Sequence, residues 1–326
     1  MEVLQFATLD VFTNIAYEGN PLALIRIPAG LSHLLTQEKK QLIAREFNLS
    51  ETVFLHENRG NNPQNEWTID IFTTTDELPF AGHPTIGSAC FVLNGLGVGA
   101  EMTKHGTLVT KAGRISISLL PSNVEMGWGM VQAEIPHEVH IHRHTLGDLQ
   151  DRIPGLSKNP GLAKAEMAAP IVSIVKGMTF LLVRLESLET LAQVEIVSSE
   201  LSFHGLLDHE NGWDTGFVAK YYYVIERGGD RENGFANGGF EVAKVRTRMM
   251  ESTMEDPATG SAACALSSYL ALKERKTRRF EITQGVEMGR RSVIGVEVVV
   301  GEEGERVQSV KLSGSAVQVM EGTLRI

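Results

Sequence analysis

The chain contains one seven-residue pattern twice, once in each half. Residues 77–83 read Glu-Leu-Pro-Phe-Ala-Gly-His, and residues 255–261 read Glu-Asp-Pro-Ala-Thr-Gly-Ser. Each copy runs into a stretch of small and apolar residues, 84–93 in the first half and 262–270 in the second. A proline turn, a glycine and a polar residue at the start of a buried helix direct backbone N–H groups at an anion. The pattern therefore predicts a pseudo-twofold protein with a carboxylate-binding cleft between two lobes.

The similarity between the halves continues after the two predicted helices. His105-Gly106 in the first half and Gln284-Gly285 in the second each open a strand, a turn and a second strand, over 107–119 and 286–300. Such helix–hairpin units are common in α+β proteins, so neither has much weight alone. Because both follow the repeated pattern at nearly the same offset, they indicate an internal duplication.

The length supports two lobes. A chain of 326 residues exceeds one ordinary compact core and fits two lobes of about 150 residues each. We predict an N-terminal lobe over 1–125 and a C-terminal lobe over 126–326, with the option that the final strand crosses back to the N-terminal lobe. The segment 121–157 is rich in His, Gly and Pro, and we interpret it as the connection.

Strands outnumber helices along the chain. Residues 66–72 alternate apolar and polar side chains, as a half-buried strand does, whereas 36–47 has the single apolar face of an amphipathic helix. The stretches 85–96 and 262–272 are apolar on all sides, which is typical of a buried helix. We therefore predict an α+β fold in which each lobe is a mostly antiparallel, curved β-sheet or barrel wrapped around one central α-helix.

Charge and composition exclude several classes of partner. The chain has 30 basic and 40 acidic residues, a formal net charge of −10, which argues against a nucleic-acid partner and does not favour an anionic membrane. Two cysteines in 326 residues form no disulfide framework, which fits a reducing compartment. No secretory signal or membrane-spanning apolar run is visible. We expect a cytoplasmic protein.

Glu51 is the first candidate for acid/base chemistry. It lies between the predicted helix 36–47 and a predicted strand at 52–55, a position that often opens onto a cleft. The apolar strand beside it would raise the pKa of the carboxyl toward neutrality, which suits proton transfer. The alternative is a solvated loop glutamate, as most of the acidic residues are.

Three further candidates lie in the repeated pattern. His83 follows a helix-starting glycine, where the helix dipole disfavours protonation; a neutral substrate-binding imidazole, a base and a simple cap are all consistent with this position. Asp256 precedes Pro257 and projects before the helix begins, or it only stabilises the helix dipole. Ser261 is either a substrate contact or an N-terminal hydroxyl cap.

Several motifs together resemble the phenazine-biosynthesis PhzF-like family, which is similar in fold to diaminopimelate epimerase. They occur in order from residue 10 to about residue 290 and so cover nearly the whole chain. The more specific ones are the two copies of the repeated pattern, and the weaker ones are Gly-Asn-Pro and Ser-Glu-Thr. In this sequence they are Asp10-Val11-Phe12-Thr13, Gly19-Asn20-Pro21, Ser50-Glu51-Thr52, Pro79–Thr85 and Glu255–Ala262.

The resemblance implies a set of site residues. It places the proton-shuttling glutamate at Glu51, and it implies that His83, Asp256 and Ser261 orient the substrate opposite it. The backbone amides at the two helix-starting glycines would hold carboxylates. The substrate-binding residues expected from these motifs are Gly82, Gly260, Asn20 and Thr259.

Cysteine placement bears on the type of reaction. Diaminopimelate epimerase has a cysteine at each helix start, whereas His83 and Ser261 occupy these positions here. Cys90 and Cys264 lie deeper in the predicted helices, where cysteine is usually a small core residue. A one-carboxylate proton shuttle therefore fits better than a pair of thiol bases.

The predicted activity is a cofactor-independent isomerisation of a small carboxylate-bearing metabolite, with Glu51 as general acid/base. No P-loop, dinucleotide fingerprint or G-x-S-x-G motif is present in the sequence, and we expect no cofactor. Two alternatives stay open. The protein is a non-catalytic small-acid-binding or scaffold protein, or it is a racemase or epimerase.

Two weaker patterns complete the sequence analysis. His137, His140, His142 and His144 resemble a metal cluster, but histidines in an exposed linker are usually solvated, and we assign no metal site. The resemblance implies a homodimer, and 219–225, with three consecutive tyrosines, is a candidate interface. The alternative is that these tyrosines belong to one lobe.

Overall fold

The chain divides into two compact units. The computed structural model describes residues 2–57, 65–95, 102–121, 129–152, 155–197, 205–208, 211–226 and 242–326. Unit 1 comprises Met1–Ile135 and Leu312–Ile326, and unit 2 comprises Pro136–Lys311.

The sheet of unit 1 is built around its first strand. β1 (Val3–Val11) pairs antiparallel with β2 on one side and with β18 on the other, and β3 then lies parallel to β2. β4 pairs antiparallel with β3 and parallel with β6. The remaining elements are β2 (Asn20–Ile27), η1 (Ser32–Leu34), α1 (Gln37–Phe47), β3 (Thr52–His56), β4 (Glu66–Phe72), β5 (Glu77–Leu78), α2 (Gly82–Leu93), β6 (His105–Thr110), β7 (Gly113–Leu119), β8 (Val131–Glu134) and β18 (Ala316–Arg325).

Unit 2 has a closely related arrangement. β9 pairs antiparallel with β10, β10 with β11, and β12 lies parallel to β11. β13 pairs antiparallel with β12 and parallel with β15. The elements are β9 (His140–Thr145), η2 (Gly147–Arg152), α3 (Pro160–Met167), β10 (Pro170–Val175), β11 (Gly177–Arg184), α4 (Leu188–Ala192), β12 (Gly216–Ile225), β13 (Val242–Met250), β14 (Glu255–Asp256), α5 (Gly260–Glu274), β15 (Arg278–Gln284), β16 (Ser292–Val300) and β17 (Val307–Gly314). The last residues of β17, from Leu312 on, belong to unit 1.

The predicted duplication appears in the order and pairing of the elements. In each unit an antiparallel pair is followed by a parallel strand, an antiparallel strand and a two-residue strand, β5 or β14, immediately before the central helix. After that helix, β6 and β15 return parallel to β4 and β13 and open a hairpin. The repeated sequence pattern thus marks the same structural point in both units.

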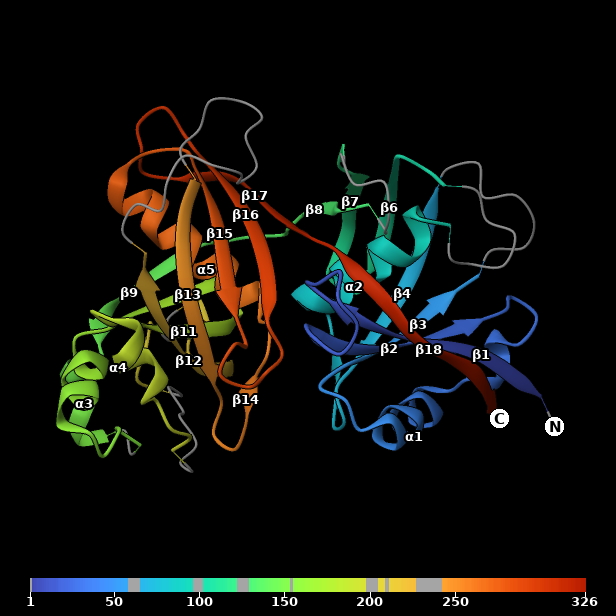
Figure 1. The fold of residues 1–326 in the computed structure, drawn as a ribbon, viewed down its shortest axis with the longest axis horizontal. Helices are drawn as coiled ribbons and strands as arrows, with labels where there is room; N and C mark the ends of the chain where they lie inside the picture. The colour runs from blue at the N-terminus through green and yellow to red at the C-terminus, as the bar shows by residue number, and fades with distance from the viewer. Residues whose placement is uncertain are drawn as a thin grey trace. The chain divides into compact units, whose positions relative to one another are not determined.

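The two central helices are buried, as predicted. All residues of α2 are buried, because the helix packs against β1, β2, β3, β6 and β7 within unit 1 (Figure 1). The close packing requires Gly87, since a Cβ atom there would lie 2.5 Å from Leu22 Cδ2 and 2.9 Å from Val11 Cγ2. α5 packs in the same way against β10, β11, β15 and β16 of unit 2.

The boundary of the first lobe is later than predicted. It lies between Ile135 and Pro136, because β8 pairs antiparallel with β7 and so remains in unit 1. The final strand β18 belongs to unit 1 through its pairing with β1. The segment 121–157 is also more than a connection, since its described part contains β8, β9 and η2.

Two other expectations are corrected by burial. The side chain of His142 is fully buried, so this histidine is not solvated. Tyr221, Tyr222 and Tyr223 are 0%, 1% and 3% exposed, because β12 is an inner strand between β11 and β13. These tyrosines are core residues of unit 2 and offer no surface to a partner. Among the described residues, no helix has both the length and the apolar character needed to cross a bilayer.

Candidate active site

The start of α2 in unit 1 leaves backbone N–H groups without a side-chain cap. The N-cap residue Ala81 is extended (φ −151°, ψ 145°) and has no side chain that accepts a hydrogen bond from the first turn. The hydroxyl of Thr85 donates instead to the Ala81 carbonyl, at 2.7 Å. A helix start of this kind presents partial positive charge and N–H donors to an anion.

The structure brings Glu51, His83 and Asn20 together beside this helix start. Asn20 opens β2, and Glu51 directly precedes β3, which runs parallel to β2, so both lie at the same end of adjacent strands. His83 is the second residue of α2. Its Nδ1 lies 3.4 Å from Glu51 Oε2 and 3.5 Å from Asn20 Nδ2. Side chains far apart in sequence therefore meet at one point.

The carboxyl of Glu51 is shielded from water. Its side chain is 17% exposed, and burial raises its pKa from about 4.5 to about 7, against a smaller opposing effect of the Ser50 hydroxyl. A carboxyl with a pKa near 7 is present in both protonation states at neutral pH, so it can accept a proton and return it. The nearby helix start favours a neutral imidazole at His83.

The start of α5 in unit 2 repeats the backbone geometry with different side chains. The N-cap residue Thr259 (φ −113°, ψ 90°) makes no side-chain cap hydrogen bond. Its hydroxyl donates to the carboxylate of Asp256 at 2.5 Å, and both residues are 8% exposed. Gly260 and Ser261 form the first turn and are buried. The structure thus places Asp256, Thr259, Gly260 and Ser261 in one cluster.

No sequence pattern predicted Gln284, the residue that holds this cluster together. Gln284, at the end of β15, is fully buried. Its side-chain amide donates to the Asp256 carbonyl at 2.8 Å and to Thr259 Oγ1 at 3.0 Å. Its side-chain oxygen accepts hydrogen bonds from the Thr259 backbone N–H and from the hydroxyl of Tyr221. The resemblance of Gln284-Gly285 to His105-Gly106 was the available signal, but it predicted that a strand opens there, whereas β15 ends at Gln284.

The cysteines lie where the sequence predicts. Cys90 is in the last turns of α2 and Cys264 in the second turn of α5, and both are fully buried. Burial raises the pKa of both thiols well above the ordinary value. Neither thiol is therefore suited to act as a base at a helix start.

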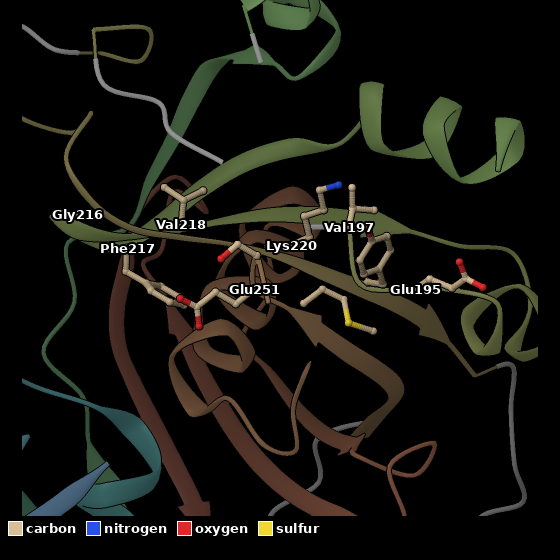
Figure 2. A pocket seen from close by; sticks show the side chains of 10 residues that line it. Glu195, Val197, Gly216, Phe217, Val218, Lys220 and Glu251 are labelled. Carbon is tan, nitrogen blue, oxygen red and sulfur yellow. The ribbon is translucent and has the colours of Figure 1, made fainter. Parts of the chain in front are cut away.

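A cavity of about 170 Å³ in unit 2 is lined by other residues. Figure 2 shows Glu195, Lys220 and Glu251 among its lining, which includes none of the predicted site residues. Two of the lining residues contact the buried Glu166. The Lys220 ammonium lies 3.1 Å from Glu166 Oε1, and the hydroxyl of Tyr222 donates to the same oxygen at 2.5 Å. Because Glu166 and Lys220 neutralise each other inside the core, this group is explained as a structural ion pair.

Comparison with known proteins identifies relatives along most of the chain. The family model described as phenazine biosynthesis-like protein (PhzC-PhzF) matches residues 9–204 and 250–322. A trans-2,3-dihydro-3-hydroxyanthranilate isomerase of Pseudomonas aeruginosa is 30% identical over 328 residues, covering 98% of each chain. An uncharacterized isomerase of Mesorhizobium japonicum is 28% identical over 347 residues, covering both chains fully.

The fold is likewise similar to solved structures. The crystal structure of a PhzF-family phenazine biosynthesis protein from Bacillus anthracis superposes with a TM-score of 0.72 at 22% identity, and each chain is fully covered. The predicted α+β fold and the predicted family resemblance are both confirmed.

Proposed function

Because the chain belongs to the phenazine biosynthesis-like PhzF family, we propose that it is an isomerase that moves a proton within a small carboxylate-bearing substrate, without a cofactor. The observation that carries this proposal is the carboxyl of Glu51. It is largely shielded from water, desolvation raises its pKa to about 7, and it lies 3.4 Å from the His83 imidazole at the start of α2. Relatives named isomerases support the class of reaction.

The proposed proton shuttle has two steps. Glu51 as a carboxylate accepts a proton from a carbon atom of the substrate; the C–H bond breaks, an O–H bond forms on Glu51, and the electron pair shifts into the conjugated system. The protonated Glu51 then donates the same proton to another atom of that molecule, which restores the carboxylate. No redox partner is consumed. In this scheme His83 acts as a neutral hydrogen-bonding group next to the reacting atoms.

The two helix starts are proposed to bind the substrate's anionic group. Neither N-cap residue, Ala81 or Thr259, makes a side-chain cap hydrogen bond, and the N–H groups of such a helix start bind carboxylates well. We propose that each helix start binds substrate, with Asn20 beside His83 and Glu51 at the first and with Asp256, Thr259 and Ser261 around the second. A structure with a bound carboxylate tests this, and an anion bound only elsewhere would contradict it.

The name of one relative suggests the first substrate to test. The Pseudomonas aeruginosa protein is named for trans-2,3-dihydro-3-hydroxyanthranilate. We propose small cyclic carboxylic acids as the substrate class, with that compound as the first to test.

The proposal is tested by measuring conversion and proton exchange of the candidate substrate. The protein is incubated with the candidate acid in deuterated water, and proton NMR follows both conversion and deuterium incorporation. We expect Glu51→Gln to lower the rate by about 10²–10⁴, because the amide keeps the shape of the side chain but accepts no proton. Glu46→Gln, which makes the same change at an exposed position on α1, serves as the control. A ligand that binds without conversion or exchange, across the whole class, would indicate a binding protein instead.

A further inference from the structure

A second cluster of polar side chains lies in unit 2 and includes none of the predicted active-site residues. It consists of His140 and His142 on β9 and of Asp208, in the described segment 205–208. One nitrogen or oxygen atom from each lies within 4.8 Å of the other two. Because side chains alternate along a strand, the two histidines share one face of β9. Their position is set by the pairing of β9 with β10.

The ring of His142 is held with one nitrogen directed at the carboxylate. Its Nε2 is 2.9 Å from the hydroxyl of Ser173, which is itself 2.7 Å from the hydroxyl of Thr179. Its Nδ1 is buried, has no hydrogen-bond partner among the described residues, and lies 3.8 Å from Asp208 Oδ2. Since a buried polar atom is normally satisfied, this nitrogen calls for an explanation.

The hydrogen bond between His142 Nε2 and Ser173 leaves Nδ1 available. When Nε2–H donates to Ser173, Nδ1 carries a lone pair and no proton. A metal-ligating histidine usually donates its other ring N–H to a hydrogen-bond acceptor that orients the ring, and the Ser173 hydroxyl is placed to accept it here.

His140 is fixed by its neighbours as well. Its ring stacks on the indole of Trp213, with ring centres 4.6 Å apart and an interplanar angle of 14°. Its Nε2 lies 2.6 Å from Asp208 Oδ2, so it faces the same oxygen as His142 Nδ1. Two imidazole nitrogens from one strand therefore converge on one carboxylate oxygen.

We propose that His140 Nε2, His142 Nδ1 and Asp208 Oδ2 bind one Zn²⁺ ion, with water completing the coordination. Zinc binds imidazole nitrogen and carboxylate oxygen at about 2.0–2.2 Å, which places two ligands of a tetrahedral ion about 3.4 Å apart. The separations of 2.6 and 3.8 Å lie on either side of this value, so small side-chain rotations suffice. The ion would tie the segment of Asp208 to β9 and would stabilise unit 2, independently of the proposed isomerase activity.

The competing explanation is an ion pair without metal. A protonated His140 would pair with Asp208, and Arg143 Nε lies 3.5 Å from Asp208 Oδ1. The Arg143 side chain is 77% exposed, so it is free to swing away, and it lies on the carboxylate oxygen that the proposed zinc does not use. This explanation leaves His142 Nδ1 without a role, whereas a metal ion uses it.

Zinc titration of the full chain, prepared without a histidine tag and stripped with a chelator, tests the proposal. Isothermal titration calorimetry at pH 7.5 should give one Zn²⁺ per chain with a micromolar or lower Kd. Asp208→Asn keeps the size of the side chain and should weaken binding at least tenfold. His144→Gln removes an exposed histidine of the same strand and should change Kd less than twofold. Arg143→Gln removes a nearby positive charge and should tighten binding.

Two further measurements keep the test independent of folding defects. Zn²⁺ should raise the Tm of the wild type and of His144→Gln but not that of Asp208→Asn. Co²⁺ binding should quench tryptophan emission, and Trp213→Phe should remove most of that quenching. The proposal is overturned if the stripped wild type binds no Zn²⁺ at 100 µM, or if Asp208→Asn and His144→Gln bind it equally well.

Discussion

The shielding of Glu51 makes the stability of the protein depend on pH. The folded carboxyl has a pKa of about 7, against about 4.5 for an ordinary glutamate. The folded state therefore binds this proton more tightly than the unfolded state does, so the contribution of Glu51 to stability is largest below about pH 4.5 and is lost as the pH rises through 7. The shift corresponds to about 3 kcal/mol.

Glu51→Gln should remove this dependence. Relative to the wild type, the variant should gain up to about 3 kcal/mol in the free energy of unfolding between pH 4.5 and pH 8.5, because glutamine does not titrate. Urea unfolding at both pH values measures the change, with Glu46→Gln at an exposed position on α1 as the matched control. A difference between Glu51→Gln and wild type that is the same at both pH values would show that Glu51 is not desolvated.

Candidate site residues could be predicted where a motif contains them, but the contacts between these residues could not be predicted. The positions of Glu51 and His83 followed from the resemblance, whereas the approach of Asn20 depends on the parallel register of β2 and β3. Gln284 and Tyr221 were missed because a buried hydrogen-bond network has no local sequence signature. Burial of His142 was missed because its spacing fits a solvated linker equally well.

At the scale of elements, the start of α5 depends on one buried amide. The Gln284 side chain joins three elements through its hydrogen bonds. Its partners are Asp256 in β14, Thr259 at the N-cap of α5 and Tyr221 in β12. Gln284→Ala removes these hydrogen bonds and opens a cavity, and it should cost about 2–4 kcal/mol of unfolding free energy.

The control for this prediction is Gln308→Ala on β17, where the side chain is exposed; it should stay within about 0.5 kcal/mol of wild type. Chemical denaturation measures both variants. Equal stability of the two variants would mean that the Gln284 network contributes nothing beyond water-mediated contacts.

The elements themselves were largely predictable because their signals are local. The all-round apolar character of α2 and α5 and the repeated pattern before them fixed both helices to within a few residues. The strands inside 121–157 were not recognised, because β8 and β9 are short and rich in polar side chains, and only their partners in the sheets define them.

At the scale of the whole molecule, association remains a prediction. The family resemblance implies a homodimer, which would have about twice the chain mass of 35.7 kDa, and closed twofold dimers are the commonest oligomers. The tyrosines of β12 are excluded as its interface by their burial. Light scattering at micromolar concentration measures the mass directly, and a monomer would contradict the prediction.

The path of the C-terminus leads to a sharper prediction about folding. β18 follows β17 of the second half, yet it pairs along the full length of β1 in unit 1, from Val3 with Arg325 to Val11 with Ala316. Phe12 also donates its backbone N–H to the Ser315 carbonyl at 2.7 Å. Without β18, β1 would keep its pairing with β2 on one side but would have an unpaired, exposed edge on the other.

Deletion of residues 315–326 should therefore destabilise β1–β4 of unit 1, which lie far from the deletion in sequence. Hydrogen exchange should show lost amide protection in β1–β4 of unit 1, while β11–β13 of unit 2 retain theirs, because global and local opening are separable. Met320→Ala, an exposed position on β18 (58%), should leave both patterns unchanged. Loss confined to unit 2, next to the deletion in sequence, would mean that β18 does not stabilise unit 1, and equal loss in both would mean that the units unfold as one cooperative body.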